Sequence, residues 1–237
     1  MNKIKTGQRI KTSNSNWKFS GKVAKYFDNH ILKSVPLYFE GHDLICNISD
    51  HFLQRNSNVY DLGCSTGTLI KKLNNRHKEK KINFHGVEIE SDMLKKAKRL
   101  NKEKNVTFLN KNLKEIRLKK NDLTISYYTI QFIPPRVRQK VINQVYESLN
   151  WGGAFLFFEK VRGPDARFQD ILTAVYNEFK LDNGFKPEEI FNKTRSLKSV
   201  LEPFSTAGNL GLLKRSGFRD IVTIQKSICF EGWLAIK

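Results

Sequence analysis

The most informative stretch of this sequence is Val59-Tyr60-Asp61-Leu62-Gly63-Cys64-Ser65-Thr66-Gly67. It begins with strand-forming residues after the polar run Asn56-Ser57-Asn58, and Leu69, Ile70 and Leu73 then recur at helical spacing. Strand, glycine-rich turn and helix are therefore contiguous. Glycine lets the backbone approach a ligand closely, and the first N–H groups of the helix point toward that ligand.

The spacing of Gly63 and Gly67 indicates which class of ligand this turn binds. It is Gly-x-x-x-Gly, which differs from the dinucleotide fingerprint and lacks the Gly-Lys-Ser/Thr of a P-loop. We therefore expect a nucleoside cofactor without phosphates.

A second strand is expected over residues 82–88, and it ends in the carboxylate of Glu88. In a βαβ unit, an acid at this position lies beside the first glycine turn and can accept both ribose hydroxyls. Asp61 alone is typical of a turn, and Glu88 alone of a surface carboxylate near a helix start. Together, in this order and spacing, they predict a nucleoside site.

Further strands alternate with helical patterns along the chain, which predicts an α/β fold with a mostly parallel sheet and helices on both faces. We expect residues 1–16 to form a flexible basic arm and residues 17–237 a single domain, with helices before the first core strand and a helical insertion at about 161–216. Within that insertion, one helical stripe is expected to face the core, or else to cover the site or form a subunit interface. The stripe consists of Phe168, Ile171, Leu172, Val175, Tyr176 and Phe179. The expected core strands are 58–62, 81–88, 106–109, 122–128, 154–160, 220–225 and 228–236.

Composition favours a cytoplasmic protein. The N-terminus lacks the apolar segment of a signal peptide, and no run is long enough for a membrane span. The cysteines Cys46, Cys64 and Cys229 are widely spaced and predict neither a disulfide framework nor a zinc site. The five histidines show no metal-ligand spacing, so no metal is expected.

The formal charge is +19, and residues 71–120 hold 17 Lys or Arg against 6 Asp or Glu. Such an excess can attract RNA, a membrane surface or an acidic small molecule. No aromatic platform is interleaved with these lysines, and they fall on helix faces typical of solvent exposure. Nucleic acid binding is therefore possible but not favoured, and no membrane partner is expected.

Through residues 61–67 and Glu88, the chain resembles class I S-adenosylmethionine-dependent methyltransferases, a family with a Rossmann-like fold. More closely, the chain is similar to the carboxy-S-adenosyl-L-methionine synthase family from about Trp17 to its end. The closer resemblance is carried by Phe19, Val23-Ala24, Phe27, Ser34-Val35-Pro36-Leu37-Tyr38, Gln131-Phe132, Leu149-Asn150-Trp151-Gly152-Gly153-Ala154, Glu159-Lys160, Asn183-Gly184-Phe185 and Ser216-Gly217-Phe218.

The resemblance implies S-adenosyl-L-methionine, or its carboxylated derivative, as cofactor, a small-molecule substrate and a homodimer. The methionine end of this cofactor would lie over the glycine turn, and its ribose would lie on Glu88. Its adenine would lie beside Asn112, where the family usually shows Asp. The implied cofactor-binding residues are Asp61, Gly63, Cys64, Ser65, Gly67, Glu88, Ile89, Met93, Asn112, Leu113 and Tyr127. The expected catalytic residues are Tyr38, Tyr128 and Gln131, which would position the reactants, and Arg195, which would bind the anion of an acceptor.

One segment departs from the family pattern. The family holds the extra carboxylate of its cofactor with an arginine in a Lys-Arg-x-x-Leu-Glu-Asn-Val segment, but residues 193–200 here read Lys-Thr-Arg-Ser-Leu-Lys-Ser-Val. Thr194 occupies the arginine position and Arg195 is displaced by one residue, which on a helix is a rotation of about 100°. A bidentate arginine tolerates little displacement.

Three functions therefore stay open. The first is methyl transfer from S-adenosylmethionine to a small anionic acceptor bound by Arg195 or Arg162. The second, implied by the resemblance, is synthesis of carboxy-S-adenosylmethionine from S-adenosylmethionine and prephenate, which serves tRNA wobble-uridine modification. The third is a non-catalytic S-adenosylmethionine-binding module that docks RNA or a protein partner. Alkyl transfer depends mostly on an aligned nucleophile in a water-free pocket, so an acid–base pair need not be conspicuous.

Overall fold

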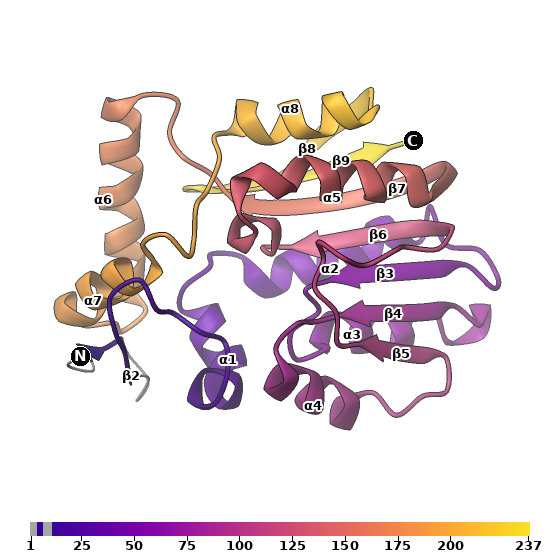
Figure 1. Cartoon of the computed structure of the whole chain (residues 1–237), viewed down its shortest axis with the longest axis horizontal. Coiled ribbons are helices and arrows are strands. Elements are labelled where there is room, and N and C mark those ends of the chain that lie inside the picture. Colours follow the sequence, from indigo (N-terminus) through magenta and orange to yellow (C-terminus); the bar gives the residue numbers. More distant parts are fainter. Residues whose placement is uncertain (1–3, 7–10) are drawn as a thin grey trace.

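The computed structural model describes residues 4–6 and 11–237, and its main sheet has the strand order β5-β4-β3-β6-β7-β9-β8. Strands β3 to β7 pair in parallel, whereas β9 is antiparallel to both β7 and β8. The prediction of a seven-stranded, mostly parallel sheet is confirmed (Figure 1). The strands span Asn58–Leu62 (β3), Asn83–Val87 (β4), Val106–Leu109 (β5), Asn121–Tyr127 (β6), Leu149–Lys160 (β7), Asp220–Ser227 (β8) and Phe230–Ile236 (β9).

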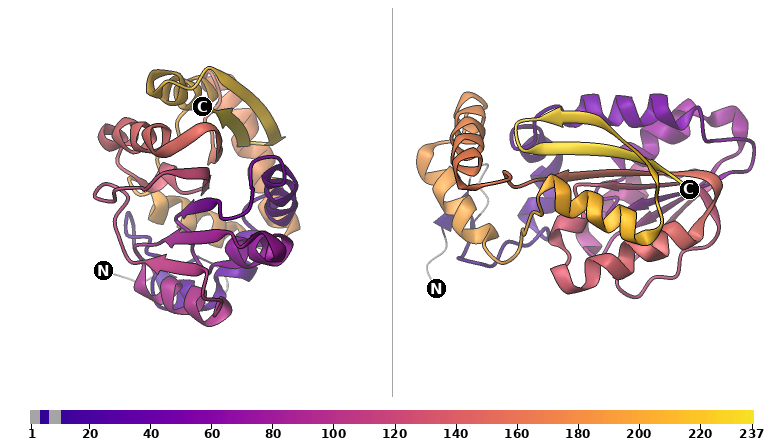
Figure 2. Two further views of the ribbon diagram at one scale, coloured as in Figure 1. Left: turned by 90° about the vertical axis from the view of Figure 1, so that its right-hand side faces the viewer. Right: turned by 90° about the horizontal axis from the view of Figure 1, so that it is seen from above.

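Helices cover both faces of this sheet (Figure 2). One apolar cluster joins the sheet to α2 and α3, and a second joins the opposite face to α5 and α8. The helices span Lys22–Leu32 (α1), Tyr38–Ser49 (α2), Thr68–Arg76 (α3), Ser91–Leu100 (α4), Pro135–Ser148 (α5), Ala166–Asp182 (α6), Pro187–Leu197 (α7) and Thr206–Ser216 (α8), with 3-10 turns at Lys78–Lys80 (η1) and Ile130–Phe132 (η2).

Burial on both faces of the sheet explains why residues 154–158 of β7 are all apolar. Phe155 and Phe157 pack into the cluster beneath α5 and α8, while Leu156 and Phe158 pack into the cluster beneath α2 and α3. Successive side chains of a strand point to opposite faces, so a strand covered on both faces requires apolar residues at every position. The strand begins at Leu149, earlier than predicted, and includes Gly152 with φ +75°.

Helices α6 and α7 lie beyond the carboxyl ends of the parallel strands, at the left of Figure 1. The N-terminal segment lies against α7, because the backbone N–H groups of Ser15 and Trp17 donate to the carbonyls of Arg195 and Ser196 at 3.0 and 3.2 Å. Earlier in this segment β1 (Ile4–Lys5) pairs with β2 (Lys11–Thr12). Residues 1–3 and 7–10 of the expected basic arm lie outside the described residues.

The helical stripe of α6 divides into two parts. Leu172 and Tyr176 pack against the core, as expected. In contrast, Phe168, Ile171 and Val175 are 45%, 53% and 42% exposed, so the expectation of a wholly core-facing stripe is wrong. The reason is that α6 contacts the rest of the molecule through one narrow face, with no sheet beneath its other side.

The basic segment 71–120 is partly neutralised by ion pairs. Lys71 pairs with Glu103, and Lys72 and Arg76 pair with Asp43 and Asp50 on and after α2 at 2.5 Å. Surface pairs of this kind contribute little to stability, but they reduce the charge that this surface offers to a polyanion. Within the described residues, no helix has both the length and the apolar character needed to cross a bilayer.

Candidate functional site

The turn after β3 is held against the end of β4. The N–H groups of Gly63 and Cys64 donate to the carbonyl of Val87 at 2.8 and 3.0 Å. Gly63 has φ +80°, and a Cβ there would lie 2.3 Å from Oγ1 of Thr129. Only glycine permits both this backbone conformation and this close approach, so the turn is fixed at the edge where the parallel strands end.

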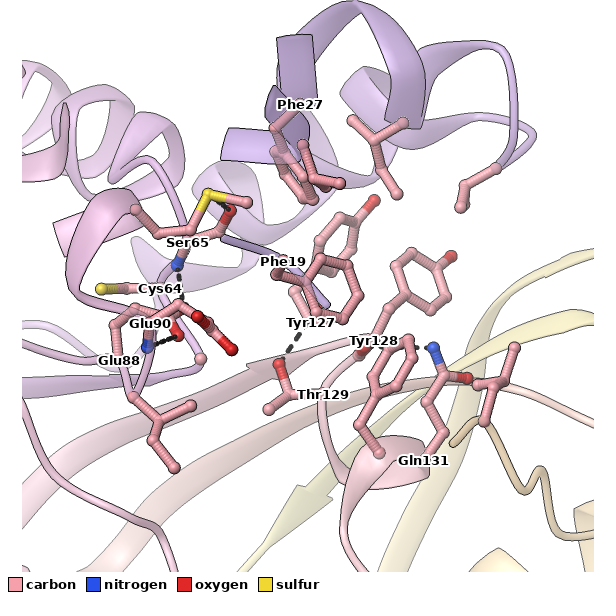
Figure 3. A pocket seen from close by; sticks show the side chains of 18 of the residues that line it. Phe19, Phe27, Cys64, Ser65, Glu88, Glu90, Tyr127, Tyr128, Thr129 and Gln131 are labelled. Carbon is pink, nitrogen blue, oxygen red and sulfur yellow. Dashed lines mark hydrogen bonds between the residues drawn. The ribbon is translucent and has the colours of Figure 1, made fainter. Parts of the chain in front are cut away.

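The carboxylate of Glu88 links this turn to β4. Its Oε2 accepts the N–H of Ser65 and its Oε1 accepts the N–H of Glu90, each at 2.9 Å (Figure 3). Burial raises the pKa of Glu88 above its ordinary value, and these backbone donors oppose that shift. The side chain is therefore held in one orientation beside the glycine turn, as the sequence predicts.

Asp61, at the end of β3, is the second buried acid of the site and is 3% exposed. Burial, and to a lesser extent the neighbouring charge of Glu88, raises the pKa of Asp61 to about 7. Two carboxylates at one end of a cavity disfavour each other's ionisation and create a site that attracts a cation.

The two acids line a cavity of about 450 Å³. The same cavity is lined by most of the predicted cofactor-binding residues, namely Gly63, Cys64, Ser65, Ile89, Met93, Asn112, Leu113 and Tyr127. Gly67 is not among its lining residues. A Cβ at Gly67 would lie 3.0 Å from Cβ of Ala97, which indicates that this glycine permits the close packing of α3 on α4.

Tyrosines form the middle of the cavity. The rings of Tyr127 and Tyr128 lie 4.5 Å apart between centroids, and the ring of Tyr38 lies 5.1 Å from that of Tyr127. The hydroxyl of Tyr127 donates to the carbonyl of Tyr38 at 2.7 Å, which fixes α2 over the end of β6. Burial raises the pKa of all three phenols, so they stay neutral. Neutral aromatic faces stabilise a cation such as a sulfonium through their quadrupoles.

Gln131 lines the same cavity, but its amide is occupied by the backbone. Its Nε2 donates to the carbonyl of Tyr128 at 3.1 Å, and its Oε1 accepts the N–H of Lys160 at 2.8 Å. Gln131 thus joins the end of β6 to the end of β7.

Lysines occupy the far end of the cavity. Lys160, at the end of β7, and Lys193, on α7, both line it. The ammonium of Lys193 lies 2.8 Å from Oγ of Ser34 and 2.7 Å from Nε2 of His30. Lys160 and Lys193 therefore place ammonium groups at the end of the cavity away from Asp61 and Glu88, while Lys111 and Lys114 line it beside Asn112.

The predicted arginines lie elsewhere. Arg195 is exposed on α7, and its guanidinium lies 5.4 Å from the ring centroid of Phe191, outside the lining of the cavity. Arg162 is also exposed and lines a separate depression with Glu202 and Phe204. Thr194, at the family's arginine position, donates its hydroxyl to the carbonyl of Ile190.

The residues missed by sequence reasoning as site residues are Lys160, Lys193, His30 and Ser34. Lys160 had a usable signal, because a charged residue directly follows the apolar run of a central parallel strand, where the site of such a sheet lies. Ser34 and Lys193 lie in segments that resemble the family, but nothing in the sequence shows that Lys193 of α7 contacts His30 and Ser34, and His30 itself had no signal. Within the described residues, no group of three or more His, Cys, Asp or Glu is placed to hold a metal ion, and the three cysteines are free and buried.

Comparisons with known proteins agree with this geometry. A methyltransferase domain model matches residues 59–153. The chain is 36% identical to a carboxy-S-adenosyl-L-methionine synthase of Staphylococcus epidermidis, over 93% of this chain and 97% of that protein. A synthase of the same name from Campylobacter lari is 34% identical over 93% of this chain and 94% of its own. The chain belongs to the carboxy-S-adenosyl-L-methionine synthase family.

Solved structures support the fold. A putative O-methyltransferase of Nostoc punctiforme superimposes with a TM-score of 0.62 at 13% identity, covering 90% of this chain and 58% of that one. Human N-acetylserotonin methyltransferase, solved with S-adenosylmethionine, gives a TM-score of 0.52 at 18% identity, covering 76% and 47%. The class I methyltransferase fold is confirmed, and with family membership the chain is an S-adenosylmethionine-dependent transferase with a small-molecule substrate.

The raised pKa of Asp61 predicts a pH-dependent affinity for the cofactor. S-adenosylmethionine carries a sulfonium and an ammonium group, which favour the ionised carboxylate, so affinity should be high above pH 7 and fall below it. A single linked proton gives a decrease of up to about tenfold per pH unit. Calorimetric titration between pH 5.5 and 8.5 measures this slope. Asp61→Asn should flatten it, and a slope unchanged in that variant would contradict the assignment.

Proposed function

We propose that S-adenosylmethionine lies in the cavity with its ribose on Glu88, its adenine against Ile89 and its sulfonium among the tyrosines. The backbone N–H groups of Ser65 and Glu90 orient the Glu88 carboxylate so that it can accept the two ribose hydroxyls. Ile89 is 58% exposed although it is apolar, and a flat base would cover it. The predicted residues Met93, Asn112 and Leu113 line the same part of the cavity.

Glu88→Ala tests this placement. Loss of two hydrogen bonds to a charged group should raise the dissociation constant of S-adenosylhomocysteine by about a hundredfold or more. The matched control is Glu115→Ala, which removes an exposed carboxylate outside the lining of the cavity and should change the constant less than about threefold. Equal effects of the two substitutions would refute a specific ribose contact.

The reaction that we propose is synthesis of carboxy-S-adenosylmethionine, with prephenate as the carboxyl donor. The observation that carries it is the match to synthases of that name along 93% of this chain. In the sequence, the displacement of Arg195 by one residue from the family's arginine position argued against this reaction. That objection weakens because Lys160 and Lys193 supply cations to the cavity although Arg195 does not.

In this reaction prephenate loses its ring carboxylate as CO2 and its ring hydroxyl as hydroxide, and becomes phenylpyruvate. One C–H bond of the sulfonium methyl group breaks, the methyl carbon forms a C–C bond to the CO2, and the released proton combines with the hydroxide to give water. Two features of the cavity suit this chemistry. The three neutral tyrosines surround the proposed methyl position and exclude water, which would otherwise quench a carbanion. Gln131 is proposed as a positioning residue, because it holds Tyr128 and Lys160 in register.

Incubation of the purified protein with S-adenosylmethionine and prephenate, followed by mass spectrometry of the cofactor, tests the reaction. We expect a product that is heavier by one carboxyl group and that requires prephenate. Methyl transfer to a small anionic acceptor is the second candidate, favoured by the match of a methyltransferase domain model to residues 59–153, although neither Arg195 nor Arg162 lines the cavity. An unchanged cofactor, together with S-adenosylhomocysteine formed only when another small acid is supplied, would replace carboxylation by methyl transfer.

The family resemblance also leads us to propose a cytoplasmic homodimer, with the exposed side of α6 as its interface. Phe168, Ile171 and Val175 form an apolar stripe on that side. Sedimentation equilibrium should show a dimer that Ile171→Asp converts to a monomer. Val222→Asp is the control, because Val222 is 55% exposed on β8 and should tolerate the charge. A monomeric unmodified protein would refute the proposal.

A further inference from the structure

Three lysines from three elements lie at the far end of the cavity, two of them over the ring of one tyrosine. The ammonium groups of Lys160 (β7) and Lys180 (α6) lie 4.2 and 4.3 Å from the ring centroid of Tyr176. Lys193 (α7) lines the same end of the cavity, with its ammonium 5.5 Å from the ring centroids of Trp17 and Phe185. We refer to Lys160, Lys180 and Lys193 as the lysine cluster.

The charges of the lysine cluster are not compensated. Among the described residues, none of the three lysines forms an ion pair with a carboxylate. Lys180 is only 5% exposed. Burial, and to a lesser extent repulsion from Lys180 and Lys160, lowers the pKa of Lys193 to about 7. Burial, and to a lesser extent repulsion from Lys160, lowers the pKa of Lys180 to about 8. Lys160 and Lys193 are half-buried and line the cavity, and Lys180 is buried behind them. Withdrawing unpaired cations from water is costly, so the grouping of these three beside a cavity indicates an anionic ligand.

The polar groups around Lys193 leave its charge available to such a ligand. Ser34 donates its hydroxyl to the carbonyl of His30 at 2.8 Å, so its Oγ accepts from Lys193. Burial lowers the pKa of His30 to about 2, so this ring is neutral. His30 is buried on the cavity wall, and its Nδ1 has no hydrogen-bond partner within the described part of the chain. These groups orient the ammonium but do not neutralise it.

We propose that the lysine cluster is a carboxylate-binding subsite, in which Lys160 and Lys193 bind a carboxylate of the substrate beyond the sulfonium and Lys180 adds a buried positive charge behind them. This inference rests on the proposed function, because it assigns the substrate's anion to one end of the same cavity. The rings of Tyr176 and Phe230 lie 4.2 and 5.9 Å from the ammonium of Lys160, so the apolar part of the same substrate would meet aromatic faces. The ligand class is therefore a small carboxylate with an apolar ring or chain.

Binding through this subsite has a proton signature. Lys193 is largely neutral in the empty site above pH 7, whereas a bound carboxylate favours its charged form and raises its pKa. A carboxylate that binds at pH 8 should therefore be accompanied by the uptake of up to about one proton, and its affinity should decrease as the pH rises.

The test titrates prephenate into protein that is saturated with S-adenosylhomocysteine and measures the heat of binding at pH 8. Repeating the titration in buffers of different ionisation enthalpy gives the number of protons taken up. The unmodified protein should bind prephenate with proton uptake. Lys193→Met should weaken this binding by at least about tenfold and reduce the uptake to the smaller part that Lys180 contributes. Lys193→Arg should keep much of the affinity with the same reduced uptake, because arginine is charged in both states. Lys198→Met is the matched control, since Lys198 is exposed directly after α7 and should behave as the unmodified protein does.

Binding of S-adenosylhomocysteine to each variant verifies that it is folded, and removal of a buried charge should not destabilise Lys193→Met. The proposal is overturned if the unmodified protein does not bind prephenate, binds it without proton uptake, or binds it equally well after Lys193→Met. A protein that binds the carboxylate as proposed but does not catalyse carboxylation would give a different result. In that case prephenate binds with proton uptake that depends on Lys193, but the cofactor gains no carboxyl group.

Discussion

The site depends on one interaction, the carboxylate of Glu88 accepting the backbone N–H groups of Ser65 and Glu90. It fixes the glycine turn of β3 relative to the end of β4, and the two carbonyl-bound N–H groups of Gly63 and Cys64 complete the connection. Because both strands are parallel, their carboxyl ends meet at the same edge of the sheet. The cavity begins at this edge, and every other element of the site is positioned relative to it.

The cavity has an internal polarity that matches the chemistry of its ligands. Asp61 and Glu88 lie at one end, the neutral tyrosines in the middle, and Lys160 and Lys193 at the other end. A cationic cofactor is attracted to the acidic end and an anionic substrate to the basic end. In a buried site such charges are weakly screened, so the ionised acids orient the cationic cofactor, and the basic end favours the anion most strongly once Lys193 has gained its proton.

The sequence was sufficient for the parts of the molecule that depend on local pattern. The strands, the turn at residues 63–67 and the acid at Glu88 follow from residue type and spacing alone, and the parallel sheet then brings them together. The sequence was insufficient where the packing of distant segments decides. Gly67 matches the motif but accommodates Ala97 of α4, and the exposed side of α6 has the same composition as its buried side. Lys193 reaches the cavity only because α7 lies against α1, a contact that no local pattern encodes.

The presence of lysines and the lack of an arginine at this end of the cavity, among the residues that the structure describes, have a physical consequence. An arginine is charged at every accessible pH, so an empty site must bear the full cost of burying its charge. Lysine can lose its proton when the site is empty, and the pKa of Lys193 near 7 places this change within the physiological range. The empty protein is thereby relieved of an unpaired buried cation, and the cation forms when the carboxylate arrives. Part of the binding energy is then spent on protonating Lys193, so a lysine subsite exchanges some affinity for a stable empty state.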